Sequence, residues 1–167
     1  MQPDPRPLTA SDDALPAMTS LTSWVGNADT KIGILTGGLV LLTGSYVRQR
    51  RPVETVLNAL EPLGVVALVL LALGVLALAC AIGHVLVALR PRLAPGDRSR
   101  FSFPHLAEAD LDELMAGDAI QVRREAWSQA RTLARIVRAK YQSFRRALSC
   151  TVISSLLLGA WVILTST

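Results

Sequence analysis

The segment from Leu63 to Leu89 contains 27 residues and no Asp, Glu, Lys or Arg. As an α-helix rising about 1.5 Å per residue it extends about 40 Å, which exceeds the roughly 30 Å hydrocarbon core of a bilayer. A helix that is apolar on every side and this long is typical of a membrane span rather than of a soluble core. This feature alone restricts the chain to folds that can be built in a membrane.

Two further apolar segments predict two more spans. Residues 147–167 carry no formal charge, and Trp161 near their far end is expected at the membrane interface. Residues 32–47 include four glycines and reach bilayer length if the helix begins near Trp24. The residues before them contain aspartates instead of a short basic region, so a cleaved signal peptide is not expected. The sequence therefore predicts an all-α membrane protein with three transmembrane helices.

These spans divide the 167 residues into four regions. Residues 1–21 contain four prolines without hydrophobic periodicity and are expected to be disordered. Residues 22–89 form a two-helix transmembrane hairpin. Residues 90–146 form a basic, helical cytoplasmic segment, and residues 147–167 form the C-terminal span.

The segment before the last span predicts one long helix. A short acidic helix is expected over residues 104–117, closed by Gly117, and a new helix begins at Asp118. Neither Gly nor Pro interrupts residues 118–158, so this helix continues into the last span. Its apolar side chains recur at spacings of three, four and seven, which indicates a packing face. These are Ile120, Trp127, Ala130, Leu133 or Ala134, Val137, Tyr141, Phe144 and Leu148.

A second stripe on this helix is basic, because Arg124, Arg131, Arg138 and Arg145 recur every seven residues. It can be a solvated face, a surface for anionic headgroups, or a binding surface for an anionic ligand. Residues 90–146 carry twelve Lys or Arg against seven Asp or Glu, so the positive-inside rule places them in the cytoplasm. Three spans then put the N-terminus inside, although the arginines at 48, 50 and 51 oppose this orientation.

The motif NADTK at residues 27–31 precedes the first apolar run and has two interpretations. Asn27 or Asp29 can be an N-cap, with Lys31 as a snorkelling anchor. Alternatively, these three residues belong to a site at the membrane face.

Gly33 and Gly37 have the spacing that lets two membrane helices approach closely, either within one subunit or between copies in a homo-oligomer.

Recognised catalytic and metal-binding motifs are absent from the sequence. It contains no Walker loop, no GxSxG motif and no His, Cys, Asp or Glu cluster with metal-ligand spacing. Cys80 and Cys150 both lie in apolar segments and are interpreted as small apolar residues. The chain is therefore expected to be non-enzymatic, without a cofactor or metal and without a nucleic-acid partner.

Two stretches together resemble one family. The first is WVGNADTKIGIL at residues 24–35, and the second is ARIVRAKYQSFRRAL at residues 134–148. Their order, with two apolar segments and a basic loop between them, resembles the transmembrane effectors of Pycsar antiphage systems. That resemblance implies a protein of the inner membrane, activated by cyclic CMP or cyclic UMP from a partner pyrimidine cyclase. It also implies loss of membrane integrity and abortive infection.

The resemblance directs attention to four residues as a nucleotide site. Arg135, Arg138 and Lys140 are the cations expected to hold the phosphate, and Tyr141, or alternatively Trp127, is expected to stack on the base. Asp29 is then expected to pair with Lys140 or an arginine and to couple the first span to the sensing helix. Two other functions are compatible with the sequence, a membrane scaffold that binds another protein through the long helix and a holin-like pore without a ligand.

Overall fold

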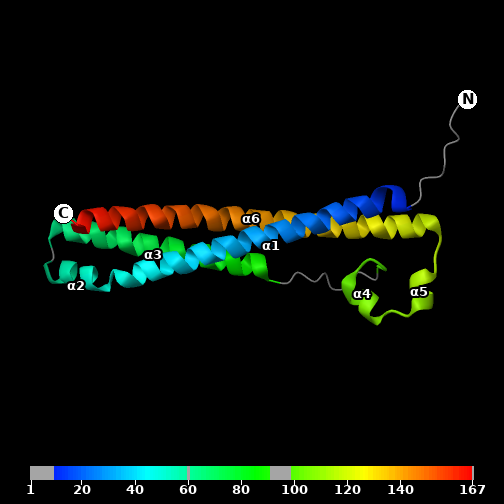
Figure 1. The fold of residues 1–167 in the computed structure, drawn as a ribbon, viewed down its shortest axis with the longest axis horizontal. Coiled ribbons are helices and arrows are strands. Elements are labelled where there is room, and N and C mark those ends of the chain that lie inside the picture. The colour runs from blue at the N-terminus through cyan, green and yellow to red at the C-terminus, as the bar shows by residue number, and fades with distance from the viewer. Residues whose placement is uncertain (1–9, 60, 91–98, 167) are drawn as a thin grey trace, which may run out of the picture. The chain divides into compact units, whose positions relative to one another are not determined.

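The computed structural model describes residues 10–59, 61–90 and 99–166, and Figure 1 shows its fold. Within these ranges the chain is helical apart from short turns and contains no strand. The helices are α1 (Ala10–Arg48), α2 (Arg50–Ala59), α3 (Pro62–Leu89), α4 (Phe103–Glu108), α5 (Leu111–Met115) and α6 (Ala119–Ser166). The all-α prediction is confirmed.

Three helices are long and apolar enough to cross a membrane, as predicted. The candidate spans are Pro16–Arg48 in α1, Pro62–Leu89, which is all of α3, and α6 itself. The last helix runs for 48 residues without a break. A proline begins α3, where its missing N–H group costs no helical hydrogen bond.

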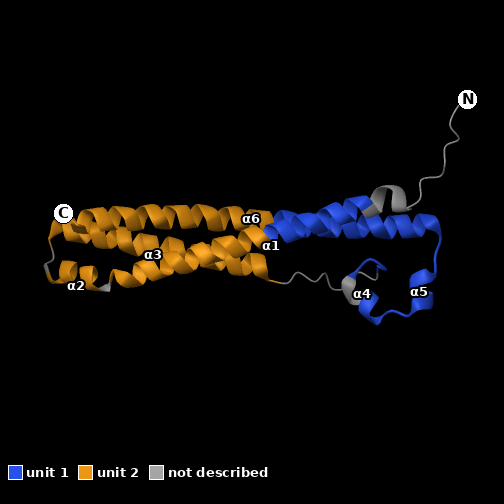
Figure 2. Cartoon of the chain, viewed as in Figure 1, with its two compact units in different colours: residues 1–28, 91–139 blue, residues 29–90, 140–167 orange. Residues whose placement is uncertain are grey.

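The chain divides into two compact units, coloured separately in Figure 2. Unit 1 comprises residues 1–28 and 91–139, and unit 2 comprises residues 29–90 and 140–167. Helices α1 and α6 each contribute residues to both units.

In unit 2, the packing face of α3 is a column of small residues at seven-residue intervals. Ala67, Gly74, Ala81 and Ala88 are buried, although α3 is apolar on all sides. Seven residues correspond to about two helical turns, so these positions lie along one face. Small side chains let neighbouring helices approach closely, which is how membrane helices gain van der Waals contact.

The other two long helices present matching faces. On α1 the buried positions are Ile32, Leu35 and Leu39, spaced as in a coiled coil, and they join a core with α3 residues and Ala147 of α6. The large side chains left outside this packing are apolar, such as Ile34 and Leu41, which are 73% and 76% exposed. An apolar outer surface fits a lipid environment, where it is not an aggregation liability.

A polar layer made by Tyr46, Gly74 and Ser154 joins α1, α3 and α6. The Ser154 hydroxyl donates a 2.8 Å hydrogen bond to the Gly74 carbonyl. The Tyr46 hydroxyl donates a 2.8 Å bond to the Ser154 carbonyl and lies 3.0 Å from its Oγ. A Cβ atom at Gly74 would overlap the Tyr46 hydroxyl oxygen, so only glycine fits there without displacing the phenol.

A second core cluster contains Ala67, Leu158 and Trp161. Trp161 is completely buried, and its indole N–H donates a 3.1 Å hydrogen bond to the Gln49 side chain. Trp161 therefore packs between helices with its hydrogen-bond donor satisfied inside the protein. Its expected level at the membrane interface stays a prediction. Val53 and Val56 of α2 pack against the same cluster.

The N-terminal prediction also needs correction, because α1 begins at Ala10 and includes Pro16. Residues 10–21, expected to be disordered, are helical, while residues 1–9 lie outside the described residues. Extending an existing helix adds one hydrogen bond for each residue fixed and avoids a new nucleation step. A span that is already helical can therefore carry the preceding residues with it.

In unit 1, the single acidic helix expected over residues 104–117 is two short helices, α4 and α5. Ala109 and Asp110 adopt extended backbone between them. Gly117 has a φ of 107° and ends this segment, as expected of glycine. The Asp118 carboxylate then accepts a 2.7 Å hydrogen bond from the Gln121 N–H, which caps the start of α6 as predicted.

The packing face of α6 agrees with the predicted apolar stripe only in part. Ala130 is buried as predicted and Phe144 packs against the core, whereas Ile120 is 73% exposed and Trp127 is 45% exposed. Ala126 and Ala147, which the predicted stripe omitted, are also buried, because small side chains occupy the close contacts.

Candidate functional site

The two motifs that first suggested a site meet in unit 2. Asp29 lies on α1 and Lys140 on α6, and the lysine Nζ lies 2.5 Å from the carboxylate Oδ1. Ala28 and Ile32, on the neighbouring face of α1, are buried. The ion pair therefore lies at the margin of a packed contact surface of α1.

A second pair crosses between the same helices. The Lys31 Nζ lies 5.6 Å from the ring centroid of Tyr141, within the range of a cation–π interaction. Residues 29 and 31 of α1 thus contact residues 140 and 141 of α6, so each helix supplies one lysine. We call these four residues the α1–α6 cluster.

The N-cap interpretation of NADTK is wrong. Residues 27–31 lie in the middle of α1, whose N–H groups at this point are already bonded within the helix. Asn27 is exposed, and Asp29 directs its carboxylate to Lys140. The motif resembles a helix start only because the polar segment precedes the apolar one.

The two halves of the Asp29–Lys140 pair differ in exposure. The Lys140 side chain is 15% exposed, whereas that of Asp29 is 45% exposed. A largely covered ammonium needs a negative partner more than a partly hydrated carboxylate does. Of the two charged groups, Lys140 therefore depends more on having an ionic partner. An incoming anion would compete with Asp29 for the Lys140 ammonium.

The other predicted ligand residues are placed less specifically. Arg135 and Arg138 are exposed on the part of α6 that belongs to unit 1, and no described carboxylate forms an ion pair with either. Tyr141 is half-buried. The structure therefore leaves the nucleotide-binding role of these residues as a prediction.

Gly33 and Gly37 make no close helix contact in the described part of the chain. Both are exposed, and a Cβ atom at either would meet no described atom within 4 Å. The same is true of Gly26 and Gly44 on α1. The described residues therefore give no support to packing within the subunit, and packing between copies stays a prediction.

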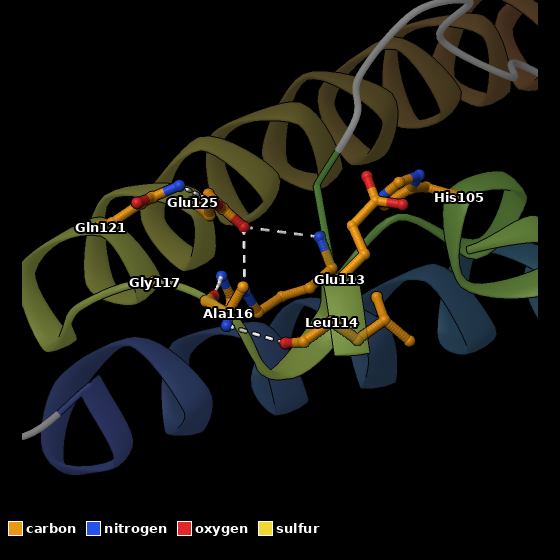
Figure 3. Close-up of a pocket in the computed structure, with 8 residues that line it drawn as sticks. His105, Glu113, Leu114, Ala116, Gly117, Gln121 and Glu125 are labelled. Carbon is orange, nitrogen blue, oxygen red and sulfur yellow. Dashed lines mark hydrogen bonds and ion pairs between the residues drawn. The ribbon is translucent and has the colours of Figure 1, made fainter. Parts of the chain in front are cut away.

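Unit 1 contains a polar pocket that the sequence did not reveal. It has a volume of about 280 Å³ and is lined by Arg100, His105, Glu113, Leu114, Ala116, Gly117, Gln121 and Glu125. Figure 3 shows His105 from α4, Glu113 from α5 and Glu125 from α6 around it. We call this the Arg100 pocket.

Arg100 holds the α4–α5 segment on α6. Its Nε donates a 3.0 Å hydrogen bond to Glu125, and its terminal nitrogens donate to the carbonyls of Leu114 and Ala116 at 2.9 and 2.7 Å. Burial tends to raise the pKa of the Glu125 carboxyl, but hydrogen bonds from Arg100 and Gln121 outweigh it, so the pKa lies below its usual value. Each of the three guanidinium nitrogens thus donates a hydrogen bond.

The Arg100 pocket is poorly suited to an anion. Two carboxylates, Glu113 and Glu125, line it together with Arg100 and His105. The His105 Nε2 lies 3.8 Å from Glu113. These contacts close a loop onto a helix, and the sequence offered no signal for them because Arg100 stands in an irregular segment.

Among the described residues, no group of three or more His, Cys, Asp or Glu could hold a metal ion.

The comparison with known families is specific over nearly the whole chain. The family model described as the Pycsar effector protein domain matches residues 13–166. The matched range includes all four residues of the α1–α6 cluster, the Arg100 pocket and the three candidate spans. No curated protein and no solved structure matches the chain.

Proposed function

We propose that this chain, which belongs to the Pycsar effector protein family, is a membrane effector activated by a cyclic pyrimidine mononucleotide. The nucleotide, cyclic CMP or cyclic UMP, comes from a partner cyclase when phage infects the cell. The activated effector impairs the inner membrane, and the infected cell dies before phage mature. The chain acts without catalysis, as a homo-oligomer with its N-terminus in the cytoplasm.

The observation that carries this proposal is the α1–α6 cluster. Its four residues connect the first span with the helix that enters the last span. A cyclic mononucleotide has one phosphate anion and one aromatic ring. The phosphate can replace the Asp29 carboxylate on Lys140, and the pyrimidine can stack on Tyr141 in place of the Lys31 ammonium. Arg135 and Arg138 add positive potential on the same helix.

Such an exchange gives the ligand a means of changing the protein. A ligand shifts a conformational equilibrium only when it binds one state more tightly than the other. If the nucleotide takes over Lys140 and Tyr141, the contacts that hold α1 against α6 are lost in the bound state. Binding energy is then available to favour a second arrangement of the spans, and that arrangement makes the membrane leak.

Dye release from liposomes tests the proposal. The purified protein is reconstituted and treated with cyclic CMP, cyclic UMP and cyclic AMP as a purine control. A cyclic pyrimidine is expected to trigger release, and Lys140→Glu and Arg138→Glu are expected to abolish it while the protein still inserts. Arg124→Glu, which changes an exposed arginine elsewhere on α6, serves as the control and should release dye like the wild type.

The results distinguish the parts of the proposal. Failure of both pyrimidine nucleotides to bind or to release dye would refute the proposed function. Release that persists in both charge-reversed variants would leave the function standing and refute the site.

One observation favours a second function, a scaffold that binds another protein. Ile120 and Trp127 are large, exposed apolar residues on the unit 1 part of α6. Large exposed apolar side chains are suited to contact with a protein partner. Loss of a co-purifying protein in an Ile120→Ser/Trp127→Ser variant, with nucleotide response unchanged, would support this function.

A further inference from the structure

Another pocket lies in unit 2 between α3 and α6, and its lining differs in charge from that of two other pockets of the described chain. Its volume is about 430 Å³, and it is lined by His84, Gln142, Arg145, Arg146, Ser149 and Cys150. The Arg100 pocket contains two glutamates, and a further pocket beside α2 contains Glu61. This basic pocket has two arginines and no carboxylate.

The α6 residues of the basic pocket share one helix face. Positions 142, 145, 146, 149 and 150 are separated by three, four, seven and eight residues from the first, which places their side chains side by side. Across from them, α3 contributes His84, whose ring nitrogens can donate or accept a hydrogen bond. Two guanidinium groups, an amide, a hydroxyl and an imidazole thus converge on one space.

The arginines of this pocket have no partner in the described part of the chain. No carboxylate there forms an ion pair with Arg145 or Arg146, and both side chains are exposed. Lys140, two helical turns or less away, differs because Asp29 neutralises it. The basic pocket therefore carries a local positive charge that the described protein does not balance.

The position of the pocket along the helices indicates its surroundings. Arg146 is the last charged residue before the uncharged end of α6, and His84 lies six residues before Arg90 at the end of α3. Six residues correspond to about 9 Å along a helix. The pocket thus opens where the apolar segments end, at the level of the headgroups, and basic pockets between membrane helices at this level bind lipid phosphates.

We propose that the basic pocket is a binding site for a phosphodiester monoanion. Arginine presents paired N–H donors that match two phosphate oxygens, and two arginines in adjacent positions suit a group with one negative charge. The volume accommodates the phosphate with the glycerol or ribose attached to it. Phospholipid headgroups and cyclic mononucleotides both carry this group, so either can supply it. The inference stands on the pocket and does not depend on the proposed function.

Binding by the full chain in a maltoside detergent, which contains no phosphate, separates the two sources. Native mass spectrometry measures binding of phosphatidylglycerol, with diacylglycerol as the matched lipid that lacks the phosphodiester. Calorimetry measures binding of cyclic CMP and cyclic UMP, with cytidine and uridine as the matched nucleosides. The wild type is expected to bind one phosphodiester ligand and to bind its phosphate-free counterpart much more weakly.

The pocket variant is Arg145→Gln/Arg146→Gln, and the matched control is Arg124→Gln/Arg131→Gln, which removes the same charge from exposed positions of the same helix. Loss of charged hydrogen bonds is expected to weaken the bound ligand about tenfold or more in the pocket variant. The control is expected to bind like the wild type. If the pocket variant loses affinity for phosphatidylglycerol, the pocket is a lipid site. If it loses affinity for the cyclic nucleotide, the pocket is a second-messenger site.

Unchanged affinity for both ligands in the pocket variant would overturn the proposal, as would an equal loss in the control. Equal binding of diacylglycerol and phosphatidylglycerol, with no nucleotide bound, would also overturn it. The pocket variant should fold, because neither arginine has a described ion-pair partner. If circular dichroism shows that this variant is unfolded, His84→Ala is used in its place. A several-fold loss of affinity in His84→Ala would support the proposal, and an unchanged affinity would overturn it. A wild type that binds lipid but no nucleotide leaves this inference intact and refutes only the proposed function.

Discussion

Asp29 and Lys140 are separated by 111 positions in the sequence, yet their side chains form an ion pair. The pair joins α1 to α6 just before the uncharged part of the last span begins. Because the Asp29 carboxylate is 45% exposed, solvent screens the pair, and such ion pairs contribute only about 0–1 kcal/mol to stability. Its importance is therefore expected in the response to a ligand rather than in holding the fold.

Replacing Asp29 with Asn is predicted to separate binding from leakage. Nucleotide still reaches Lys140, with equal or greater affinity because the competing carboxylate is gone, but dye release falls because the coupled contact is already broken. Binding by calorimetry and release from liposomes are measured on the same preparation. Glu54→Gln, an exposed charge on α2, is the control. Dye release equal to that of the wild type would show that Asp29 has no coupling role.

Gly74→Ala is predicted to destabilise the bundle through the polar layer. The new methyl group overlaps the Tyr46 hydroxyl, and overpacking of this kind costs about 1–3 kcal/mol. Thermal unfolding in detergent should show a lower midpoint. Gly83→Ala on the same helix, where nothing lies within 4 Å, is expected to be silent. Combining Gly74→Ala with Tyr46→Phe should recover part of the loss, and no recovery would contradict the assigned clash.

The Arg100–Glu125 contact predicts a pH-dependent stability of unit 1. The pKa of Glu125 is lowered in the folded chain, so folding favours the carboxylate. Its contribution is present at neutral pH and is lost as pH falls from the ordinary value of 4.5 through the lowered pKa. At pH 7, Glu125→Gln should therefore be less stable than the wild type by about 1–3 kcal/mol. Its unfolding midpoint should be lower for that reason.

The difference in unfolding midpoint between the wild type and Glu125→Gln should disappear in strong acid, because the Glu125 carboxyl of the wild type is then protonated and uncharged as well. Tryptophan fluorescence during heating measures both midpoints at each pH. Glu113→Gln removes the pocket's other carboxylate, which is 59% exposed, and is expected to change the midpoint little. A difference that persists unchanged below the lowered pKa would contradict the assignment.

Gly37→Ile is predicted to weaken assembly of a homo-oligomer without disturbing the subunit. Gly33 and Gly37 are exposed on α1, and a Cβ atom added at Gly37 would meet no described atom within 4 Å. Between two copies it would block close approach of the backbones. Light scattering in mild detergent measures the mass. Gly83→Ile provides a matched control on α3, and a wild type that is strictly monomeric with and without nucleotide would rule out the assembly.

Orientation is predicted from the excess of cations in residues 90–146. A reporter inserted after Ala94, outside the described residues, should be accessible from the cytoplasm, and one fused after Thr167 should be external. A cytoplasmic C-terminus would contradict a three-span topology with the N-terminus inside.

The length and composition of the apolar segments were sufficient to predict three spans and a long last helix. They were not sufficient to predict how α3 packs, because nearly all its residues are apolar and hydrophobicity distinguishes no face. The informative signal was size, with Ala or Gly at every seventh position from residue 67 to residue 88. The burial of Trp161 was not predictable for a related reason, since composition cannot show that Gln49 satisfies the indole N–H.

The candidate site was predictable where two motifs with unusual polar residues flanked apolar segments. That expectation led to Asp29 and Lys140, which the structure brings into contact. The Arg100 pocket was not predictable, because Arg100 lies in an irregular segment before α4 and its contacts are with the end of α5 and with α6. The basic pocket was not predictable either, because His84 and its neighbours Arg145 and Arg146 come from two helices about sixty residues apart in the sequence.

The polar layer also bears on how the protein is made. Synthesis proceeds from the N-terminus, so Tyr46 and Gly74 enter the membrane before Ser154 has been translated. Until α6 arrives, the Tyr46 hydroxyl lacks both of its Ser154 contacts. An unsatisfied hydroxyl in hydrocarbon is unfavourable. The first two spans therefore form an incomplete pair that the last span finishes, so a chain truncated before residue 154 should be recognised as unassembled and degraded.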